Sequence, residues 1–250
     1  MTDFIRALSF LTILPIGRRL PHDEKRLARS MAFYPLAGLV IGGLSALVLF
    51  LLSSLFPKPL ALWLTLGLSV LLTGGLHLDG FSDTLDGIGC RGTREKILEV
   101  MKDSRVGAFG ATGLLFLIVA KYLALDQLTI RDAADALVSA AVMGRASMVL
   151  VCYHSPYARA AGGLAKPFTE HLGARELVFA SASALGLALL LSGPKGAVLF
   201  LGMGVFSLGY RLFFLKKLGG VTGDILGAAN ELNELLSLLL IVALLRLPVL

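Results

Sequence analysis

Charged side chains are scarce in this chain: Asp, Glu, Lys and Arg make up only 16% of its 250 residues. Soluble domains average about 25%. The hydrophobic residues, by contrast, reach 56% and gather in long uninterrupted runs. This composition excludes an ordinary soluble domain and predicts a protein that crosses a membrane several times.

Cysteine and tryptophan are also rare, with two cysteines and one tryptophan in the whole chain. Cys90 lies in a polar segment and Cys152 ends an apolar run, so we expect no disulfide and a reduced Cys90 facing the cytosol. Trp63 fits an interfacial anchor or a lipid-facing position. The chain has no internal repeat, no low-complexity tract and no stretch typical of a soluble domain. We therefore expect residues 1–250 to form a single integral-membrane catalytic domain.

Seven apolar runs approach the length of about 20 residues that a helix needs to cross a bilayer. They cover residues 31–56, 60–78, 107–125, 133–153, 176–192, 195–215 and 232–247. A shorter apolar stretch at residues 4–14 predicts an interfacial or re-entrant helix. The fold class we expect is an all-α polytopic helix bundle of about seven transmembrane helices plus this N-terminal helix.

The loops between these runs carry an asymmetric charge. Alternating them places 17 of the 23 Lys and Arg residues on one side, in residues 1–30, 79–106, 154–175 and 211–223. The positive-inside rule then predicts that the N-terminus and the polar loops face the cytoplasm, in the cell (inner) membrane. The net charge of +6 comes from these short loops, so it indicates topology and phosphate contacts, and no nucleic-acid partner is expected.

The densest polar segment runs from residue 74 to residue 110 and begins with three aspartates. Asp79, Asp83 and Asp86 follow the spacing i, i+4, i+7, which places them on one face of a helix. Carboxylates gathered in this way repel one another unless a cation lies among them, and ligation by oxygen alone favours Mg²⁺. The alternative is a solvated helix with an acidic face and no ligand.

Basic residues follow the aspartates in the same segment. Arg91, Lys102 and Arg105 lie near Asp103 in the sequence. Basic residues of this kind suit a phosphorylated substrate.

A second acidic segment occupies residues 216–234, which we expect to be the last cytoplasmic loop. Asp224 and Glu231 are seven residues apart and share a face if the helix between them is unbroken. Gly219, Gly220, Thr222 and Gly223 precede them, and a glycine-rich helix start allows backbone N–H groups to approach a phosphate. An ordinary inter-helix turn has the same composition, so this pattern alone is weak.

Several strings of the sequence closely resemble the cobalamin synthase (adenosylcobinamide-GDP ribazoletransferase) family. They are GGLHLDGFSDTLDG (74–87), MKDSRVGAFG (101–110) and GGVTGDILGA (219–228), with FLTILP (10–15) and FYPLAGLVIGG (33–43) nearer the N-terminus. The resemblance implies a multi-pass membrane enzyme of the last steps of vitamin B12 biosynthesis. Such enzymes join adenosylcobinamide-GDP to α-ribazole or α-ribazole 5′-phosphate, release GMP and need Mg²⁺. Candidate partners are a second copy of the chain and other enzymes of cobalamin assembly.

Transfer from a diphosphate linkage builds charge on phosphorus oxygens, which carboxylate-held divalent ions neutralise. The candidate metal ligands are Asp79, Asp83, Asp86, Asp224 and Glu231. The candidate catalytic residues are Asp83, Asp86, Asp103 and Arg105, with Asp86 or Asp103 as the proton acceptor. The candidate substrate-binding residues are Arg91, Lys102, Arg105, Gly219, Gly220 and Thr222.

Two other functions fit parts of the pattern. Enzymes of the CDP-alcohol phosphatidyltransferase type use a comparable aspartate cluster, but their pattern begins Asp-Gly-x-x-Ala-Arg. Here Asp79-Gly80 is followed by Phe-Ser-Asp-Thr, so the Ala-Arg pair is missing. A transporter would show ionisable residues at mid-membrane depth and a paired repeat, whereas nearly all acids here are predicted at one membrane face.

Overall fold

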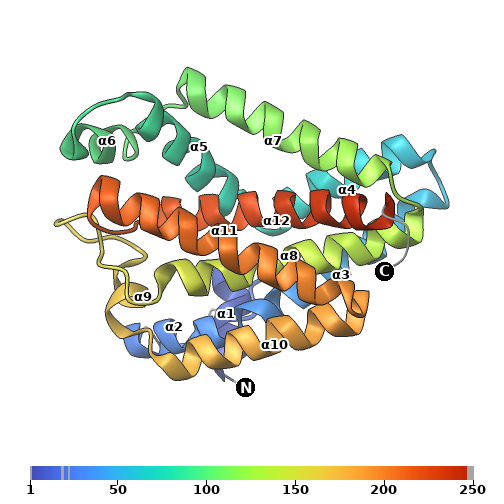
Figure 1. Ribbon diagram of the computed structural model, residues 1–250, viewed down its shortest axis with the longest axis horizontal. Helices are drawn as coiled ribbons and strands as arrows, with labels where there is room; N and C mark the ends of the chain where they lie inside the picture. The colour runs from blue at the N-terminus through green and yellow to red at the C-terminus, as the bar shows by residue number, and fades with distance from the viewer. Residues whose placement is uncertain (1, 18–19, 22, 247–250) are drawn as a thin grey trace.

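The computed structural model describes residues 2–17, 20–21 and 23–246, and nearly all of its regular structure is helical (Figure 1). The elements are α1 (Thr2–Leu11), α2 (Glu24–Ser30), η1 (Met31–Phe33), α3 (Tyr34–Ser53), α4 (Lys58–Leu72), α5 (Leu76–Gly89), α6 (Arg94–Val100), α7 (Ala108–Asp126), α8 (Ile130–Cys152), α9 (Lys166–His171), α10 (Ala174–Ser192), α11 (Lys195–Leu218) and α12 (Gly223–Arg246). Within the described residues, the only β-type pairing is an isolated bridge between Tyr157 and Val221.

Six helical segments are long and apolar enough to cross a membrane. They are Glu24–Ser53, which joins α2, η1 and α3, and the helices α7, α8, α10, α11 and α12. The pair α4 and α5 adds a seventh if it is counted as one bent span. The predicted all-α membrane bundle is confirmed.

Helix α8 forms the centre of the bundle and is almost wholly buried, with α3, α10, α11 and α12 packed around it (Figure 1). Small residues on α3 allow this packing: a Cβ on Gly42 would lie 2.6 Å from the Cα of Val138, so no larger residue fits there without a shift. Gly38 makes a similar approach to Ala141. The next residue, Gly43, is also a glycine but faces open space, because it lies on another face of α3.

The apolar run at residues 60–78 does not form one straight helix, which corrects the sequence-based prediction. Helix α4 ends at Leu72, and Gly74 and Gly75 follow with φ of 62° and 68°. Glycine adopts this left-handed backbone without the steric cost of a side chain. Helix α5 therefore leaves at 89° to α4, and this bend turns its aspartate face toward α12.

The predicted loop at residues 216–234 is much shorter than expected, and the predicted span at 232–247 begins too late. Helix α11 continues to Leu218 and ends at Gly219, whose φ is 69°. Thr222 then caps α12, because its Oγ1 accepts the backbone N–H of Ile225 at 3.3 Å. Residues 223–246 form one continuous helix, and residue 247 lies outside the described part of the chain.

The N-terminal helix α1 confirms the short helix predicted at residues 4–14. It packs on α2 and α3, with Ala7 and Leu11 fully buried. Beyond its end, the backbone N–H of Ile13 donates to the carbonyl of Leu72 at 2.9 Å. The N-terminal segment therefore covers the end of the short helix α4.

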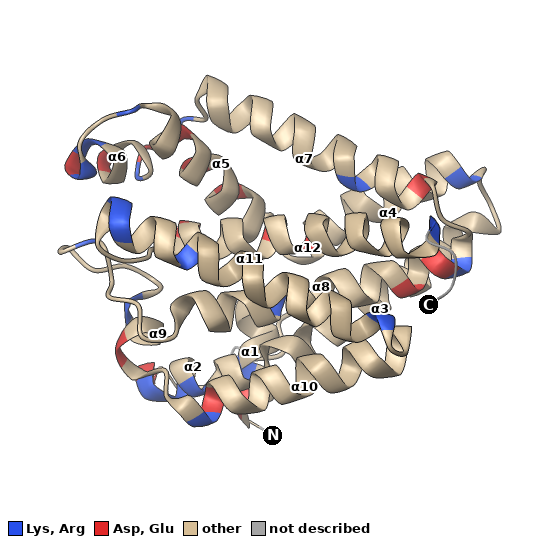
Figure 2. Ribbon diagram, in the orientation of Figure 1, with Lys and Arg blue, Asp and Glu red and all other residues tan. Residues whose placement is uncertain are grey.

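Charged side chains gather at the two ends of the bundle (Figure 2). The end that carries α6, α9 and the α11–α12 turn brings the three polar loops together. Arg94 on α6 joins them, because it donates to the carbonyls of Ala158 and Leu218 at 2.7 Å each. The predicted grouping of these loops on one side is confirmed.

Candidate functional site

The two acidic segments meet where α5 crosses the start of α12. A Cβ on Gly80 would lie 2.8 Å from the Cα of Asp224, so the backbones touch and only glycine fits without displacing a helix. One helical turn earlier, the Cα of His77 lies 3.2 Å from where a Cβ of Gly227 would be. Residues separated by more than 140 positions in sequence are thereby brought side by side.

Three carboxylates and one guanidinium form a cluster at this crossing, which we call the acidic junction: Asp79, Asp83, Asp224 and Arg159. The charges of the three aspartates act on one another. Asp83 and Asp224 are partly buried, whereas Asp79 is exposed. Arg159 donates to Asp224 Oδ2 at 2.6 Å and to the carbonyl of Met101 at 3.1 Å. One cation against three acids leaves two uncompensated negative charges.

Arg159 is the functional residue that the sequence analysis did not select. It lies in the loop between α8 and α9, in a string with no recognised motif, and its only signal was a positive charge in a loop on the acidic side. Its partner Asp224 is 65 residues away, so spacing gives no indication of the contact.

The acidic junction has the donor chemistry of a Mg²⁺ site. Its ligands would all be carboxylate oxygens, which hard divalent ions prefer, and its surplus negative charge favours a cation. Among the described residues, no three acidic, histidine or cysteine side chains already enclose a metal position. Asp224 is instead turned toward Arg159, so the fit rests on the donor set and on the charge surplus.

Asp86 lies one turn beyond Asp83 but has a different environment. Its carboxylate accepts the backbone N–H groups of Gly107 and Gly110 at 2.7 and 2.8 Å. It therefore anchors the start of α7. Its predicted metal and catalytic roles have to be weighed against these two hydrogen bonds, which already occupy both of its oxygens.

Asp103 and Arg105 pair with each other at the surface. Arg105 Nη2 lies 2.6 Å from Asp103 Oδ2, and these hydrogen bonds lower the pKa of Asp103 to about 2. A carboxylate with such a low pKa is a weak base. Both residues line a surface hollow of about 420 Å³ together with Asp86, whereas Asp79 and Asp224 line another cavity. The predicted phosphate-binding residues Arg91 and Lys102 are exposed on the flanking loops.

Glu231 lies away from the acidic junction. It is on the face of α12 that points into the bundle, roughly 10 Å along the helix from Asp224. Its Oε2 lies 2.6 Å from Lys121 Nζ, and Lys121 is buried. The structure therefore does not bring Glu231 to the other predicted metal ligands.

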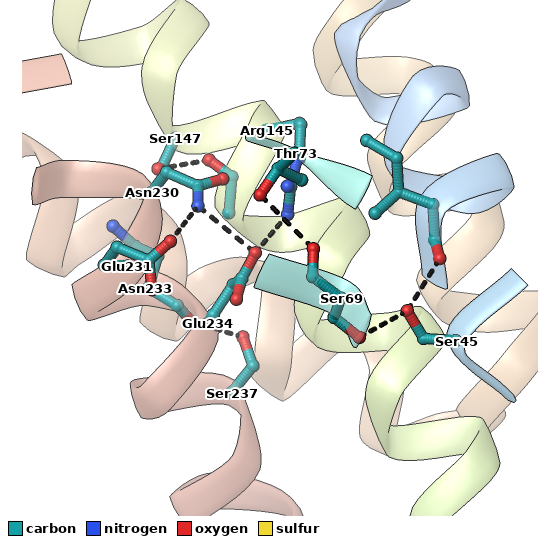
Figure 3. A network of polar contacts seen from close by, with 12 residues as sticks. Ser45, Ser69, Thr73, Arg145, Ser147, Asn230, Glu231, Asn233, Glu234 and Ser237 are labelled. Atoms are coloured by element: carbon teal, nitrogen blue, oxygen red, sulfur yellow. Dashed lines mark hydrogen bonds and ion pairs between the residues drawn. The ribbon is translucent and has the colours of Figure 1, made fainter. Parts of the chain in front are cut away.

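Glu231 belongs to a group that we call the buried ion network: Lys121, Arg145, Asn230, Glu231 and Glu234. Figure 3 shows Arg145 of α8 reaching Glu234 of α12, with the amide of Asn230 bonded to both glutamates. Two cations face two acids, so the network is balanced. It corrects the expectation that nearly all acids lie at one membrane face.

The glycine-rich turn before α12 packs against the loop that carries Arg159. A Cβ on Gly220 would lie 2.3 Å from the carbonyl oxygen of Pro156, so this glycine is explained by a close backbone contact. Gly219 ends α11 and is exposed, while Thr222 is fully buried beneath the start of α12. The predicted phosphate contacts of these three residues stay predictions.

Comparison with known proteins gives consistent matches over nearly the whole chain. The Cobalamin-5-phosphate synthase family matches residues 3–242. An adenosylcobinamide-GDP ribazoletransferase of Syntrophobacter fumaroxidans is 41% identical over 95% of this chain and 96% of its own length. Proteins of the same name from Klebsiella pneumoniae (strain 342) and Vibrio cholerae (strain O395) are 40% and 34% identical, over 95% and 97% of this chain and 98% and 94% of their own lengths. No solved structure gives a significant match.

Proposed function

The chain belongs to the cobalamin-5-phosphate synthase family, and we propose that it transfers the cobinamide-phosphate group of adenosylcobinamide-GDP to α-ribazole or α-ribazole 5′-phosphate. The products are adenosylcobalamin, or its 5′-phosphate, and GMP. The observation that carries the proposal to particular residues is the acidic junction, where Asp79, Asp83 and Asp224 converge with two negative charges in excess.

The reaction exchanges a phosphoanhydride bond of the donor for a phosphoester bond to the acceptor. A ribose hydroxyl oxygen of the acceptor bonds to the phosphorus attached to cobinamide, and the bond from that phosphorus to the bridging oxygen breaks. GMP leaves with the bridging oxygen, and the hydroxyl proton passes to a base. Negative charge grows on the leaving phosphate and on the oxygens of the transferred phosphorus, so the site has to supply positive charge.

We assign Mg²⁺ to Asp79, Asp83 and Asp224, with Asp86 and Glu231 left to the structural contacts described above. Bound there, Mg²⁺ supplies positive charge to the diphosphate. Arg159 is placed to bind a phosphate oxygen once it is released from Asp224, since a guanidinium matches phosphate geometry. Asp79 and Asp83 are better suited to accept the proton than Asp103. Hydrogen bonds from Arg105 lower the pKa of Asp103, which makes it a weak base.

We also propose that the protein lies in the inner membrane and that the acidic junction is on its cytoplasmic side. The excess of Lys and Arg on the loops at this end supports that orientation. A cytoplasmic site meets a water-soluble nucleotide donor without transport. A second copy of the chain or other cobalamin enzymes are further candidates for partners.

The direct test is GMP release by the purified protein. It is incubated with adenosylcobinamide-GDP, α-ribazole and Mg²⁺, and GMP and the joined corrinoid product are quantified together. We expect equal amounts of both, and we expect EDTA to stop the reaction and added Mg²⁺ to restore it. Product formation that is unchanged in EDTA would contradict the metal assignment.

A matched incubation with CDP-diacylglycerol and small alcohols tests the rival lipid chemistry. We expect no CMP, because the Ala-Arg pair of that pattern is missing after Asp79-Gly80. CMP release in the lipid incubation, without GMP release in the corrinoid incubation, would overturn the proposed function.

A further inference from the structure

A small cavity opens beside the acidic junction and shares two of its carboxylates. It has a volume of about 190 Å³ and is lined by Asp79 and Asp224 at one wall. The remaining lining residues are mostly apolar and aromatic, and they come from α1, η1, α3, α5, α8, α9, α12 and the loop between α8 and α9. The lining side chains include Phe10, Tyr34, His77, Phe168 and Arg159.

Two of these side chains carry buried polar atoms that have no partner among the described residues. They are the hydroxyl of Tyr34, on a fully buried residue, and both ring nitrogens of His77, which is 2% exposed. An unpaired buried polar group costs about 1–3 kcal/mol. Such a cost is expected where a ligand completes the hydrogen bonds.

The size of the cavity limits what it binds. Pockets for drug-sized ligands usually span about 300–1,000 Å³, so a cavity of about 190 Å³ holds one small ring system. The corrin macrocycle of the donor is far too large for it. The remaining planar groups in the reaction are the guanine and the adenine of the donor and the benzimidazole base of the acceptor.

The lining favours the benzimidazole. Guanine carries acceptors at O6 and N7 and donors on its other edge, and adenine carries acceptor ring nitrogens and an amino donor. Apolar walls would leave most of these groups unpaired. Dimethylbenzimidazole has an apolar methylated edge and a single free acceptor nitrogen. Phe168 stands edge-on to Phe10 and Tyr34, with ring centroids 5.1 and 6.3 Å apart, and such rings pack well against another aromatic ring.

We propose that this cavity binds the benzimidazole base of α-ribazole, with the Tyr34 hydroxyl donating to its free ring nitrogen. The proposal rests on the proposed function, because it takes α-ribazole as the acceptor. With the base in the cavity, the ribose lies against His77, Asp79 and Asp224. The attacking hydroxyl then faces the carboxylates of the acidic junction.

The test removes the Tyr34 hydroxyl from the protein and the free ring nitrogen from the acceptor, separately and together. GMP release is measured at saturating adenosylcobinamide-GDP and Mg²⁺, with α-ribazole or with the analogue whose free ring nitrogen is replaced by C–H. For the parent, we expect the analogue to raise the KM for the acceptor about 3- to 10-fold, the loss typical of one hydrogen bond. For Tyr34→Phe, we expect both acceptors to give the same, raised KM, while kcat and the KM for the donor stay within about twofold of the parent.

Two controls separate this role from a structural one. Tyr122→Phe removes the same atom on α7, outside the cavity, and should leave the discrimination between the two acceptors unchanged. Without ligand, Tyr34→Phe should melt at the same temperature as the parent or higher, because it removes an unpaired buried hydroxyl. A lower melting temperature, without any change in acceptor discrimination, would make Tyr34 a structural residue.

The outcomes also separate the two proposals. GMP release in which the parent and Tyr34→Phe discriminate equally between the acceptors would overturn the benzimidazole site and leave the proposed function intact. No GMP release by the parent with either acceptor would contradict the proposed function, and the benzimidazole site would fail with it. As a second variant, Ala165→Leu places a larger side chain in the cavity wall and should raise the KM for α-ribazole alone.

Discussion

The acidic junction and the buried ion network lie on the same helix and differ in their balance of charge. Asp224, at the start of α12, belongs to a group with three acids and one cation. Glu231 and Glu234, two to three turns later, face two cations. The acidic junction has unpaired negative charge, so it is available to bind a cation. In the buried ion network each acid already has a cationic partner.

The difference follows from burial. In the buried ion network the side chains of Arg145 and Lys121 are 3% and 10% exposed, so an unpaired charge there would be very costly. In the acidic junction the side chains of Arg159 and Asp224 are 19% and 21% exposed, and water or an ion reaches them. The network therefore joins α7, α8 and α12 through paired buried charges, and we propose that the junction carries the chemistry.

The largest effect is expected for Asp83→Asn. It removes one charge from the acidic junction without changing the size of the side chain. We expect kcat/KM for GMP release to fall at least about 1,000-fold, equivalent to about 4 kcal/mol, with normal membrane insertion and melting temperature. Asp135→Asn, on an exposed part of α8, is the matched control. Activity within a few-fold of the parent at saturating Mg²⁺ would remove Asp83 from the site.

In the buried ion network, a substitution should lower stability and leave transfer activity unchanged, the reverse of what we expect in the acidic junction. Glu234→Gln leaves Lys121 and Arg145 with only one acid, and breaking a buried pair costs about 3–5 kcal/mol. We expect a much lower unfolding free energy in detergent, while the folded fraction keeps transfer activity. Glu95→Gln, an exposed acid on α6, should change neither. If Glu234→Gln is as stable as the parent, the network is not what holds these helices together.

A smaller effect is expected for Arg159→Lys. The variant keeps the charge but loses Nη2, which donates to both Asp224 and the Met101 carbonyl. It also loses the planar guanidinium that matches phosphate geometry. We predict that kcat/KM falls about 10-fold, or about 1.4 kcal/mol, mainly through the KM for adenosylcobinamide-GDP. Arg175→Lys, an exposed arginine of α10, is the control. An unchanged KM for the donor would show that Arg159 serves only to hold Asp224.

The smallest perturbation tests which side of the membrane carries the acidic junction. Cys90 is exposed at the end of α5, and Cys152 is buried. In sealed right-side-out vesicles, an impermeant thiol reagent should not label Cys90, and labelling should appear once the vesicles are opened. Labelling of sealed vesicles would place the junction outside the cell.

The membrane bundle could be predicted from the sequence because apolar length and loop charge act locally. The aspartate spacing on α5 and the later acid at Asp224 likewise gave both halves of the acidic junction. What could not be predicted depends on geometry. The bend at Gly74–Gly75 looked like part of one apolar span, because composition does not report backbone angles.

The buried ion network escaped prediction for a related reason. Lys121 and Glu231 are 110 residues apart, and each by itself reads as a residue near a helix end. Only the length of α12, which begins at Gly223, places Glu231 inside the bundle opposite α7. Arg159 was missed because its contact with Asp224 depends on how two loops fold together.

The most direct test is a double-mutant cycle across the α5–α12 crossing. GMP release is measured for Asp83→Asn, Asp224→Asn and the variant that carries both, at saturating Mg²⁺ and substrates. If the two carboxylates serve one site, each single variant loses nearly all activity and the double variant loses little more. A double variant whose loss equals the product of the two single losses would contradict a shared site and leave Asp224 as a residue of helix packing.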